Sequence, residues 1–147
     1  MQKILNLELT NSLTETETII HLVEQHLADN NCREEILFNI NLVVDEVFSN
    51  IVRYAFTNNT EHKILFSAYK NGNDLTLEFI DEGKPFNPLK QKAPDITGDI
   101  EKRKAGGLGI HLVKKFSKSI IYKRENEKNI FSVTFNLNME NNNADNN

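Results

Sequence analysis

Apolar residues recur at every second position in several segments of the chain, a pattern typical of β-strands with one buried face. This alternation predicts strands over residues 4–9, 62–68, 75–81, 119–123 and 130–137. Between the second and third strands lies Asn71-Gly72-Asn73, which suits the positive φ angles of a tight hairpin turn. The pattern therefore predicts a sheet built largely from strands that are near neighbours in sequence.

Three other segments have apolar residues at helical spacing. The first helix is expected to follow the capping-box sequence Ser12-Leu13-Thr14-Glu15 and to end near Asn30. The second covers about residues 33–56 without a Gly or Pro. A third begins after a glycine cluster at residues 106–109, and the stretch 82–105 before that cluster is expected to be a long loop.

This order of elements predicts an α/β fold. We expect a two-layer α/β sandwich with a mixed, mostly antiparallel sheet and three helices on one face. A Rossmann fold would place the glycines in an early strand-to-helix turn, with an acidic residue about twenty positions later. A P-loop would need Gly-Lys-Ser or Gly-Lys-Thr, which the sequence lacks.

Length and composition limit the possible functions. The 147 residues suit one domain, expected over residues 1–138, followed by an Asn-rich tail at 139–147 that we expect to be disordered. A net charge of −4 argues against non-specific nucleic-acid binding. We expect neither a membrane-spanning helix, for want of a long apolar run, nor a signal peptide. The single cysteine favours a cytoplasmic protein without an internal disulfide.

One face of the predicted second helix carries a stripe of polar residues. Glu46, Asn50 and Arg53 stand at positions i, i+4 and i+7, so they share one helix face. The carboxamide oxygen of Asn50 can ligate Mg²⁺, and Asp45 and Glu46 concentrate carboxylates beside it. The alternative interpretation is a solvated helix surface.

Asp81 ends a hydrophobic strand and is followed by Glu82-Gly83. A carboxylate at the buried end of a strand can accept a hydrogen bond from an adenine amino group, and Gly83 would let the backbone approach the base. Asp followed closely by Gly is also common in simple turns.

Gly106, Gly107 and Gly109 precede a helix whose free N–H groups can bind phosphate. Lys104 lies just before them, so the segment in front could fold over a triphosphate and contribute positive charge. Loop-to-helix packing alone would also explain the glycines.

Together these motifs resemble the asparagine box and the two glycine boxes of GHKL ATPases. The matching stretches are Glu46-x-x-x-Asn50, Asp81-x-Gly83-x-Pro85-Phe86 and Gly106-Gly107-Leu108-Gly109. Within that superfamily, residues 50–56 and 107–113 resemble the anti-sigma-factor serine kinases of bacterial partner-switching systems. The similarity covers roughly residues 5–137. It departs from the usual family pattern at Tyr54, where a His is common, and at Ser117-Lys118, where an acidic residue is usual.

The resemblance implies a role for each matched position. Glu46 would be the base that orients or deprotonates the attacking hydroxyl, Asn50 the Mg²⁺ ligand, and Asp81 the partner of the adenine amino group. Thr134 resembles a position that assists adenine binding through water. The cofactor-binding set expected for ATP is Asn50, Asp81, Gly83, Lys104, Gly106, Gly107, Leu108, Gly109 and Thr134.

The leading hypothesis is therefore an ATP- and Mg²⁺-dependent protein serine kinase. It would phosphorylate a STAS-type anti-sigma-factor antagonist and sequester a sigma factor when free. The resemblance also implies a homodimer built through the first strand and helix, although the leucines at positions 5, 7 and 9 could equally belong to the core. One alternative is an ATP-binding interaction module without kinase activity. A sensor histidine kinase domain is disfavoured because no dimerisation helix with a phosphoacceptor His precedes the motifs.

Overall fold

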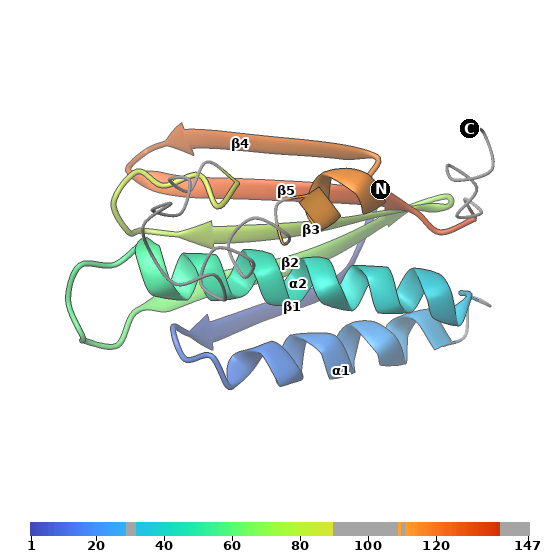
Figure 1. Ribbon diagram of the computed structural model, residues 1–147, viewed down its shortest axis with the longest axis horizontal. Helices are drawn as coiled ribbons and strands as arrows, with labels where there is room; N and C mark the ends of the chain where they lie inside the picture. Colours follow the sequence, from blue (N-terminus) through green and yellow to red (C-terminus); the bar gives the residue numbers. More distant parts are fainter. Residues whose placement is uncertain (29–31, 90–108, 110, 139–147) are drawn as a thin grey trace, which may run out of the picture.

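The protein is an α/β sandwich in which two long helices and a short helical segment at residues 111–116 cover one face of a five-stranded sheet (Figure 1). The computed structural model describes residues 1–28, 32–89, 109 and 111–138. The helices are α1 (Glu15–Ala28) and α2 (Glu34–Tyr54), and residues 111–116 are also helical. The strands are β1 (Gln2–Thr10), β2 (Lys63–Asn71), β3 (Asp74–Asp81), β4 (Ser119–Glu125) and β5 (Lys128–Asn136).

The sheet has the strand order β1-β2-β3-β5-β4, and all four pairings between these strands are antiparallel. The expected architecture is confirmed, with an antiparallel rather than a mixed sheet. The β2–β3 turn contains Gly72 at φ +62°, as the sequence predicted. In the β4–β5 turn, Asn126 and Glu127 both have positive φ, which matches the twist of a two-residue hairpin.

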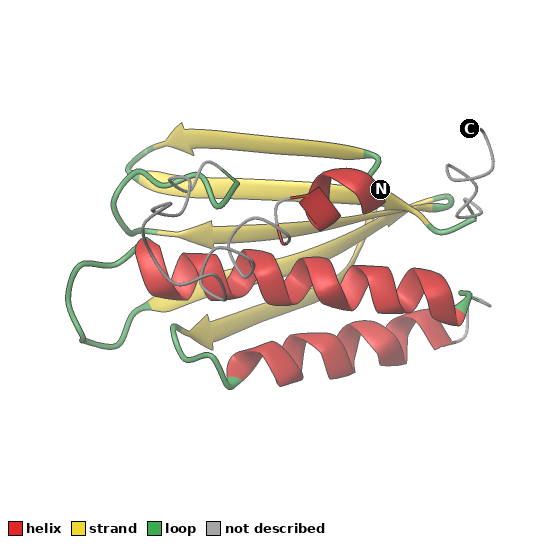
Figure 2. Ribbon diagram, in the orientation of Figure 1, coloured by secondary structure: helices red, strands yellow, loops and turns green. Residues whose placement is uncertain are grey.

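The core lies between the helices and the sheet (Figure 2). The helix-facing positions of β2, β3 and β5 are nearly all buried hydrophobic side chains, because alternate residues of a strand share one face. On α2 the buried side follows the predicted helical period and includes Ile40, Val44 and Val47. Leu5 and Leu9 of β1 also belong to this core. The sequence had left open whether the leucines of this strand are core residues, and these two are.

The first turn of α1 differs from the expected capping box. The Ser12 hydroxyl accepts a weak hydrogen bond from the backbone N–H of Thr14, at 3.4 Å. The Glu15 carboxylate instead accepts a bond from the backbone N–H of Thr10, at 2.9 Å. Glu15 therefore ties the helix start to the end of β1 rather than back to Ser12.

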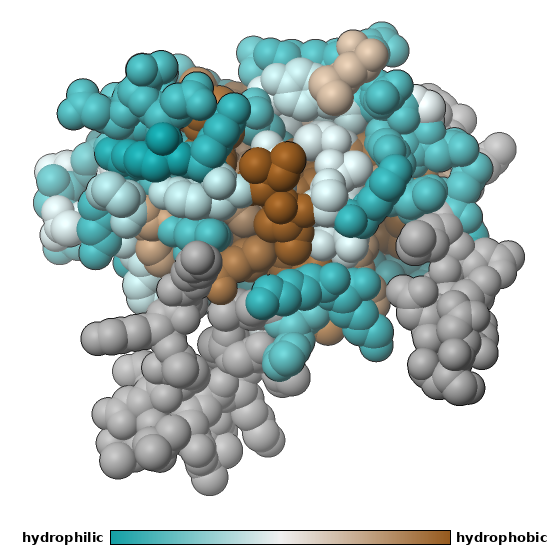
Figure 3. Space-filling view, turned by 90° about the horizontal axis from the view of Figure 1, so that it is seen from above, coloured by the Kyte–Doolittle hydropathy of each residue, from teal (hydrophilic) through white to brown (hydrophobic). Residues whose placement is uncertain are grey.

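The sheet face away from the helices carries mostly polar and hydroxyl side chains. Apolar exceptions include Leu65 of β2, 39% exposed, Ile121 of β4, 58% exposed, and the partly buried Ile80 of β3 and Ile130 of β5. Viewed from the β4 side, the surface is largely hydrophilic with a hydrophobic strip near its middle (Figure 3).

Among the helices of the described residues, none has the length and apolar character needed to cross a bilayer.

Candidate functional site

The buried face of α2 carries a linked pair of polar side chains. Asn50 is 3% exposed, and its amide Nδ2 donates to Glu46 Oε2 at 2.9 Å and to the carbonyl oxygen of Pro88 at 3.1 Å. Both amide protons are thereby used, so Oδ1 is the Asn50 atom with acceptor capacity for a cation. The i, i+4 spacing that the sequence showed is therefore a hydrogen-bonded pair, and Asn50 is not solvated surface.

Glu46 is half-buried, and its environment favours the protonated form. Desolvation raises the pKa of its carboxyl above the ordinary value of 4.5, and the charge of Asp45 raises it further. The hydrogen bond from Asn50 and the charge of Arg53 lower the pKa and so oppose this shift. A raised pKa makes the Glu46 carboxylate a stronger proton acceptor than an ordinary exposed glutamate.

Gly109 packs directly against the Glu46 carboxylate. A Cβ atom added at Gly109 would overlap Cδ and both carboxylate oxygens of Glu46. Only glycine allows the helix of residues 111–116 to start this close to α2 without moving that side chain. The structure therefore brings together a glycine and a glutamate that are far apart in the sequence.

Asp81 ends β3 on the helix-facing side of the sheet and is 3% exposed. Its Oδ1 accepts the backbone N–H of Gly83 at 2.8 Å and Nδ2 of Asn129 at 2.9 Å. Burial raises the pKa of the Asp81 carboxyl, while these two hydrogen bonds and the charge of Arg124 partly offset the rise. Because Oδ1 already accepts two hydrogen bonds, Oδ2 is the carboxylate oxygen that is more available to a further donor.

The loop after Asp81 packs over the C-terminal end of α2. Lys84 donates its backbone N–H to the Ala55 carbonyl oxygen at 2.8 Å, and a Cβ at Gly83 would overlap that same oxygen. Further along, Pro88 accepts the bond from Asn50 described above. The loop thus joins the end of β3 to the polar face of α2, so that Asp81 and Asn50 belong to one region.

Gly83→Ala is expected to destabilise the protein by about 1–3 kcal/mol, because the added methyl meets backbone atoms that cannot rotate away. Chemical denaturation followed by circular dichroism would measure the loss. Gly72→Ala is a useful comparison, since a Cβ there meets no atom within 4 Å and only the positive φ is unfavourable. Unchanged stability of Gly83→Ala would contradict the close packing.

Asn129 is a site residue that the sequence interpretation missed. It is 2% exposed and lies directly opposite Asp81 in the β3–β5 register. The predicted strand began at residue 130, one position too late to include it. The available signal was the period of two, because Asn129 continues the helix-facing series of Phe131 and Val133.

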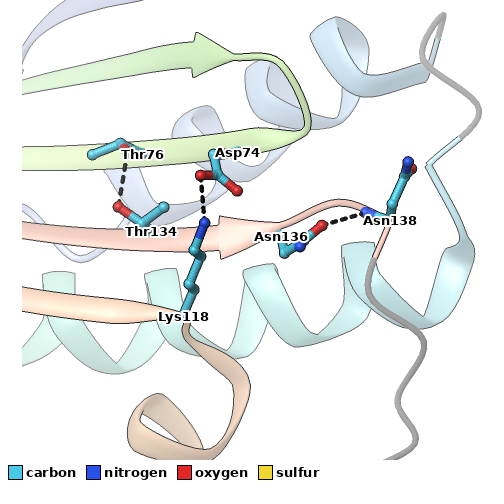
Figure 4. Close-up of polar contacts among 6 residues, drawn as sticks. All are labelled: Asp74, Thr76, Lys118, Thr134, Asn136 and Asn138. Atoms are coloured by element: carbon cyan, nitrogen blue, oxygen red, sulfur yellow. Dashed lines mark hydrogen bonds and ion pairs between the residues drawn. The ribbon is translucent and has the colours of Figure 1, made fainter.

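The expectation for Thr134 is corrected by the structure. Thr134 lies between the buried Val133 and Phe135, so its side chain is on the sheet face away from the helices. There its hydroxyl bonds to that of Thr76 at 2.8 Å (Figure 4). It is also five residues along β5 from the Asp81–Asn129 pair, roughly 17 Å at the usual strand rise. Thr134 is therefore not part of the site.

The structure describes only part of the predicted phosphate-binding segment. Lys104, Gly106, Gly107 and Leu108 lie outside the described residues, as does the tail at 139–147, and Gly109 alone of the cluster is placed. The residues that are placed fit a magnesium nucleotide. Mg²⁺ in phosphate sites commonly takes one or two protein oxygens and keeps waters and phosphate oxygens as its other ligands. Asn50 Oδ1, beside the Glu46 carboxylate, provides such a donor set.

The fold and this site define an α/β domain in which a buried strand-end carboxylate and a polar helix face lie in one region. The chain belongs to the histidine kinase-like ATPase domain family, whose match covers residues 9–135. This membership confirms the GHKL resemblance and implies that the protein binds ATP.

Individual relatives agree with this assignment. The chain is 23% identical over 128 residues to the serine/threonine-protein kinase BtrW of Bordetella bronchiseptica. The aligned region covers 87% of this chain and 90% of BtrW. The fold of the present chain is similar to that of a chain in the SiaB–SiaC complex of Pseudomonas aeruginosa. The TM-score is 0.61 at 14% identity, and the match covers 91% of this chain and 90% of that chain. It also resembles the histidine kinase domain of Erythrobacter litoralis EL346, with a TM-score of 0.55, 14% identity, and coverage of 88% and 62%.

Proposed function

We propose that the protein is an ATP-dependent serine kinase that phosphorylates a STAS-type anti-sigma-factor antagonist and, when free, sequesters a sigma factor. The similarity to a relative named as a serine/threonine-protein kinase supports this proposal. So does the similarity in fold to a chain of a two-protein complex. We also propose a cytoplasmic location, in keeping with the single cysteine.

The observation that carries the kinase proposal is the position of Glu46 beside an open groove. The groove lies between the start of α1 and the middle of α2, and its volume is about 560 Å³. Leu13 and Ile20 line its α1 side, while Glu46 and Ser49 line its α2 side. A hydroxyl presented in this groove can reach Glu46, which also accepts a bond from Asn50 and packs against Gly109.

The proposed mechanism divides the work between two residues of α2. Bound Mg²⁺ would neutralise charge on the phosphates, with Asn50 Oδ1 as its protein ligand. Glu46 orients the incoming serine hydroxyl and accepts its proton at a carboxylate oxygen. The Asn50 amide holds that carboxylate by the bond to Oε2, so the same residue would hold both the cation and the catalytic base.

The direct test is transfer of phosphate from radiolabelled ATP to a purified STAS-domain antagonist of the same organism. We expect one labelled serine, located by mass spectrometry. ATP and antagonist binding without label would instead support an interaction module that transfers no phosphate. In a separate experiment, sigma-factor binding should fall when unphosphorylated antagonist is added.

A homodimer formed through β1 and α1 is also proposed. β1 is an edge strand of the five-stranded sheet, so within the described residues one of its hydrogen-bonding edges faces no other strand. Multi-angle light scattering over a range of concentrations should give a mass near 34 kDa, twice the 16.9 kDa of one chain. A concentration-independent mass of one chain would contradict the dimer.

Gly109→Ala is expected to slow phosphate transfer about 10- to 100-fold with little loss of stability. The added methyl displaces the Glu46 carboxylate, the flexible end of a side chain, and such small misplacements of a catalytic group are costly in rate. Single-turnover transfer and thermal unfolding would measure the two effects. A variant with normal transfer would show that the contact between Gly109 and Glu46 has no catalytic role.

The transfer rate should fall on acidification with a midpoint above 4.5, because burial raises the pKa of the Glu46 carboxyl and only its ionised form accepts a proton. Arg53→Gln should move this midpoint to higher pH, since the Arg53 charge lowers that pKa. Single-turnover rates measured from pH 5 to 8 would test both statements. A midpoint that stays fixed in the variant would contradict the electrostatic coupling.

A further inference from the structure

We propose that Asn129 is a positioning residue that determines base selectivity: it holds Asp81 Oδ1, so that Asp81 Oδ2 alone faces the nucleotide base. This inference rests on the proposed contact between Asp81 and the adenine amino group. It adds Asn129, which lies opposite Asp81 on the neighbouring strand β5 and acts through Asp81 without touching the base.

The amide nitrogen of Asn129 is held by two acceptors. Nδ2 donates to Asp81 Oδ1 at 2.9 Å and to the Lys84 carbonyl oxygen at 2.8 Å. The first bond joins β5 to the end of β3, and the second joins β5 to the loop that follows Asp81. Both amide protons therefore serve the segment that carries the base-recognition carboxylate.

The amide oxygen of Asn129 is held by three donors. Oδ1 accepts the backbone N–H of Phe86 at 3.0 Å, the Tyr122 hydroxyl at 2.6 Å and Arg124 Nη1 at 3.1 Å. Rotating the amide by 180° would oppose NH₂ to the Phe86 N–H and the Arg124 guanidinium, which can only donate, and the oxygen to two acceptors. The surrounding groups therefore leave Asn129 a single orientation.

This orientation has a direct consequence for Asp81. Oδ1 already accepts from both Asn129 and the Gly83 N–H, so Oδ2 is the oxygen available to a ligand. Adenine presents an amino group at the position where guanine presents a carbonyl oxygen. A carboxylate oxygen accepts from the first and repels the second. If Asn129 did not hold Oδ1, Asp81 could rotate and this distinction would weaken.

A role in stability alone makes a different prediction. Asn129 ties β3, β4 and the loop at residues 82–86 together, so its loss will also destabilise the fold. Destabilisation by itself lowers ATP and GTP binding equally and leaves their ratio unchanged. The ratio of the two affinities is therefore the readout that separates positioning from support.

The experiment is calorimetric titration of Mg-ATP and Mg-GTP into wild type, Asn129→Asp and Asn129→Ser. Asn129→Asp keeps the shape and the three oxygen contacts but replaces the donor to Asp81, and Asn129→Ser avoids placing a second carboxylate there. We expect each variant to lose about 10- to 100-fold in the ATP-to-GTP affinity ratio. Phe135→Leu, at a buried position near the far end of β5, is the control for destabilisation and should keep the wild-type ratio.

Acidification gives a second readout for Asn129→Asp. A protonated Asp at position 129 can again donate to Asp81 Oδ1, so selectivity should recover partly as the pH falls from 8 to 6. Folded variants with the wild-type ratio at every pH would overturn the positioning role. If wild type itself fails to prefer ATP, the proposed contact of Asp81 with adenine fails instead.

Discussion

Asp81→Asn should bind Mg-ATP about 30- to 150-fold more weakly than wild type, the largest effect on nucleotide affinity expected from a single isosteric change. The Asn side chain can still accept the bonds from Gly83 and Asn129 through its own oxygen. Its amide group, however, replaces the acceptor Oδ2 by a donor that opposes the adenine amino group. Loss of a hydrogen bond to a charged group costs about 2–3 kcal/mol, which corresponds to this loss of affinity. Calorimetric titration gives the dissociation constants.

The stability of the same variant should depend on pH in a defined direction. Burial raises the native pKa of Asp81 above its ordinary 3.8, so the native state holds the proton more tightly than the unfolded chain. That contribution to stability is present below pH 3.8 and is lost as the pH rises through the native value. Relative to wild type, Asp81→Asn should therefore become more stable between pH 4 and pH 7.

Asp74→Asn is the matched control for Asp81→Asn. Asp74 pairs with Lys118 at 2.7 Å (Figure 4). It begins the same strand that Asp81 ends, so it lies at the opposite end of β3 from the site. Its variant should bind ATP as wild type does. Equal ATP affinity of Asp81→Asn and wild type would show that Asp81 does not contact the base.

Glu46→Gln should reduce phosphate transfer about 10²- to 10⁴-fold while ATP affinity stays within about 3-fold of wild type. Gln keeps the length of the side chain and can still accept the Asn50 bond through its oxygen, so the nucleotide site is preserved. What it loses is the ability to accept a proton from the serine hydroxyl. Single-turnover transfer from radiolabelled ATP and calorimetric ATP titration measure the two quantities.

Glu24→Gln provides the control for Glu46→Gln. Glu24 lies on α1, and its carboxylate accepts a bond from Asn41 Nδ2 at 3.1 Å, which the variant can retain. Its transfer rate should equal that of wild type. If Glu46→Gln transfers phosphate at the wild-type rate, another group is the base; if it also loses ATP, the residue supports the site rather than the chemistry.

Much of the fold follows from local patterns in the sequence. The period of two in the strands and of 3.6 in the helices depends only on which residues are apolar, so the alternation of residues 75–81 predicted β3 directly. The turn at Gly72 followed from a local preference for positive φ. The Glu46–Asn50 pair was also visible in advance, because helix geometry brings positions i and i+4 together.

The sequence by itself thus determined the elements, the two-layer class and the polar pairs that share one element or one turn. The tertiary structure alone decided which distant segments meet. Register pairs Asn129 with Asp81, helix packing sets Gly109 against Glu46, and strand parity turns Thr134 to the opposite face. The reason is physical: local patterns encode the period of a segment, whereas contacts between segments depend on register and packing, which arise only when the whole core forms.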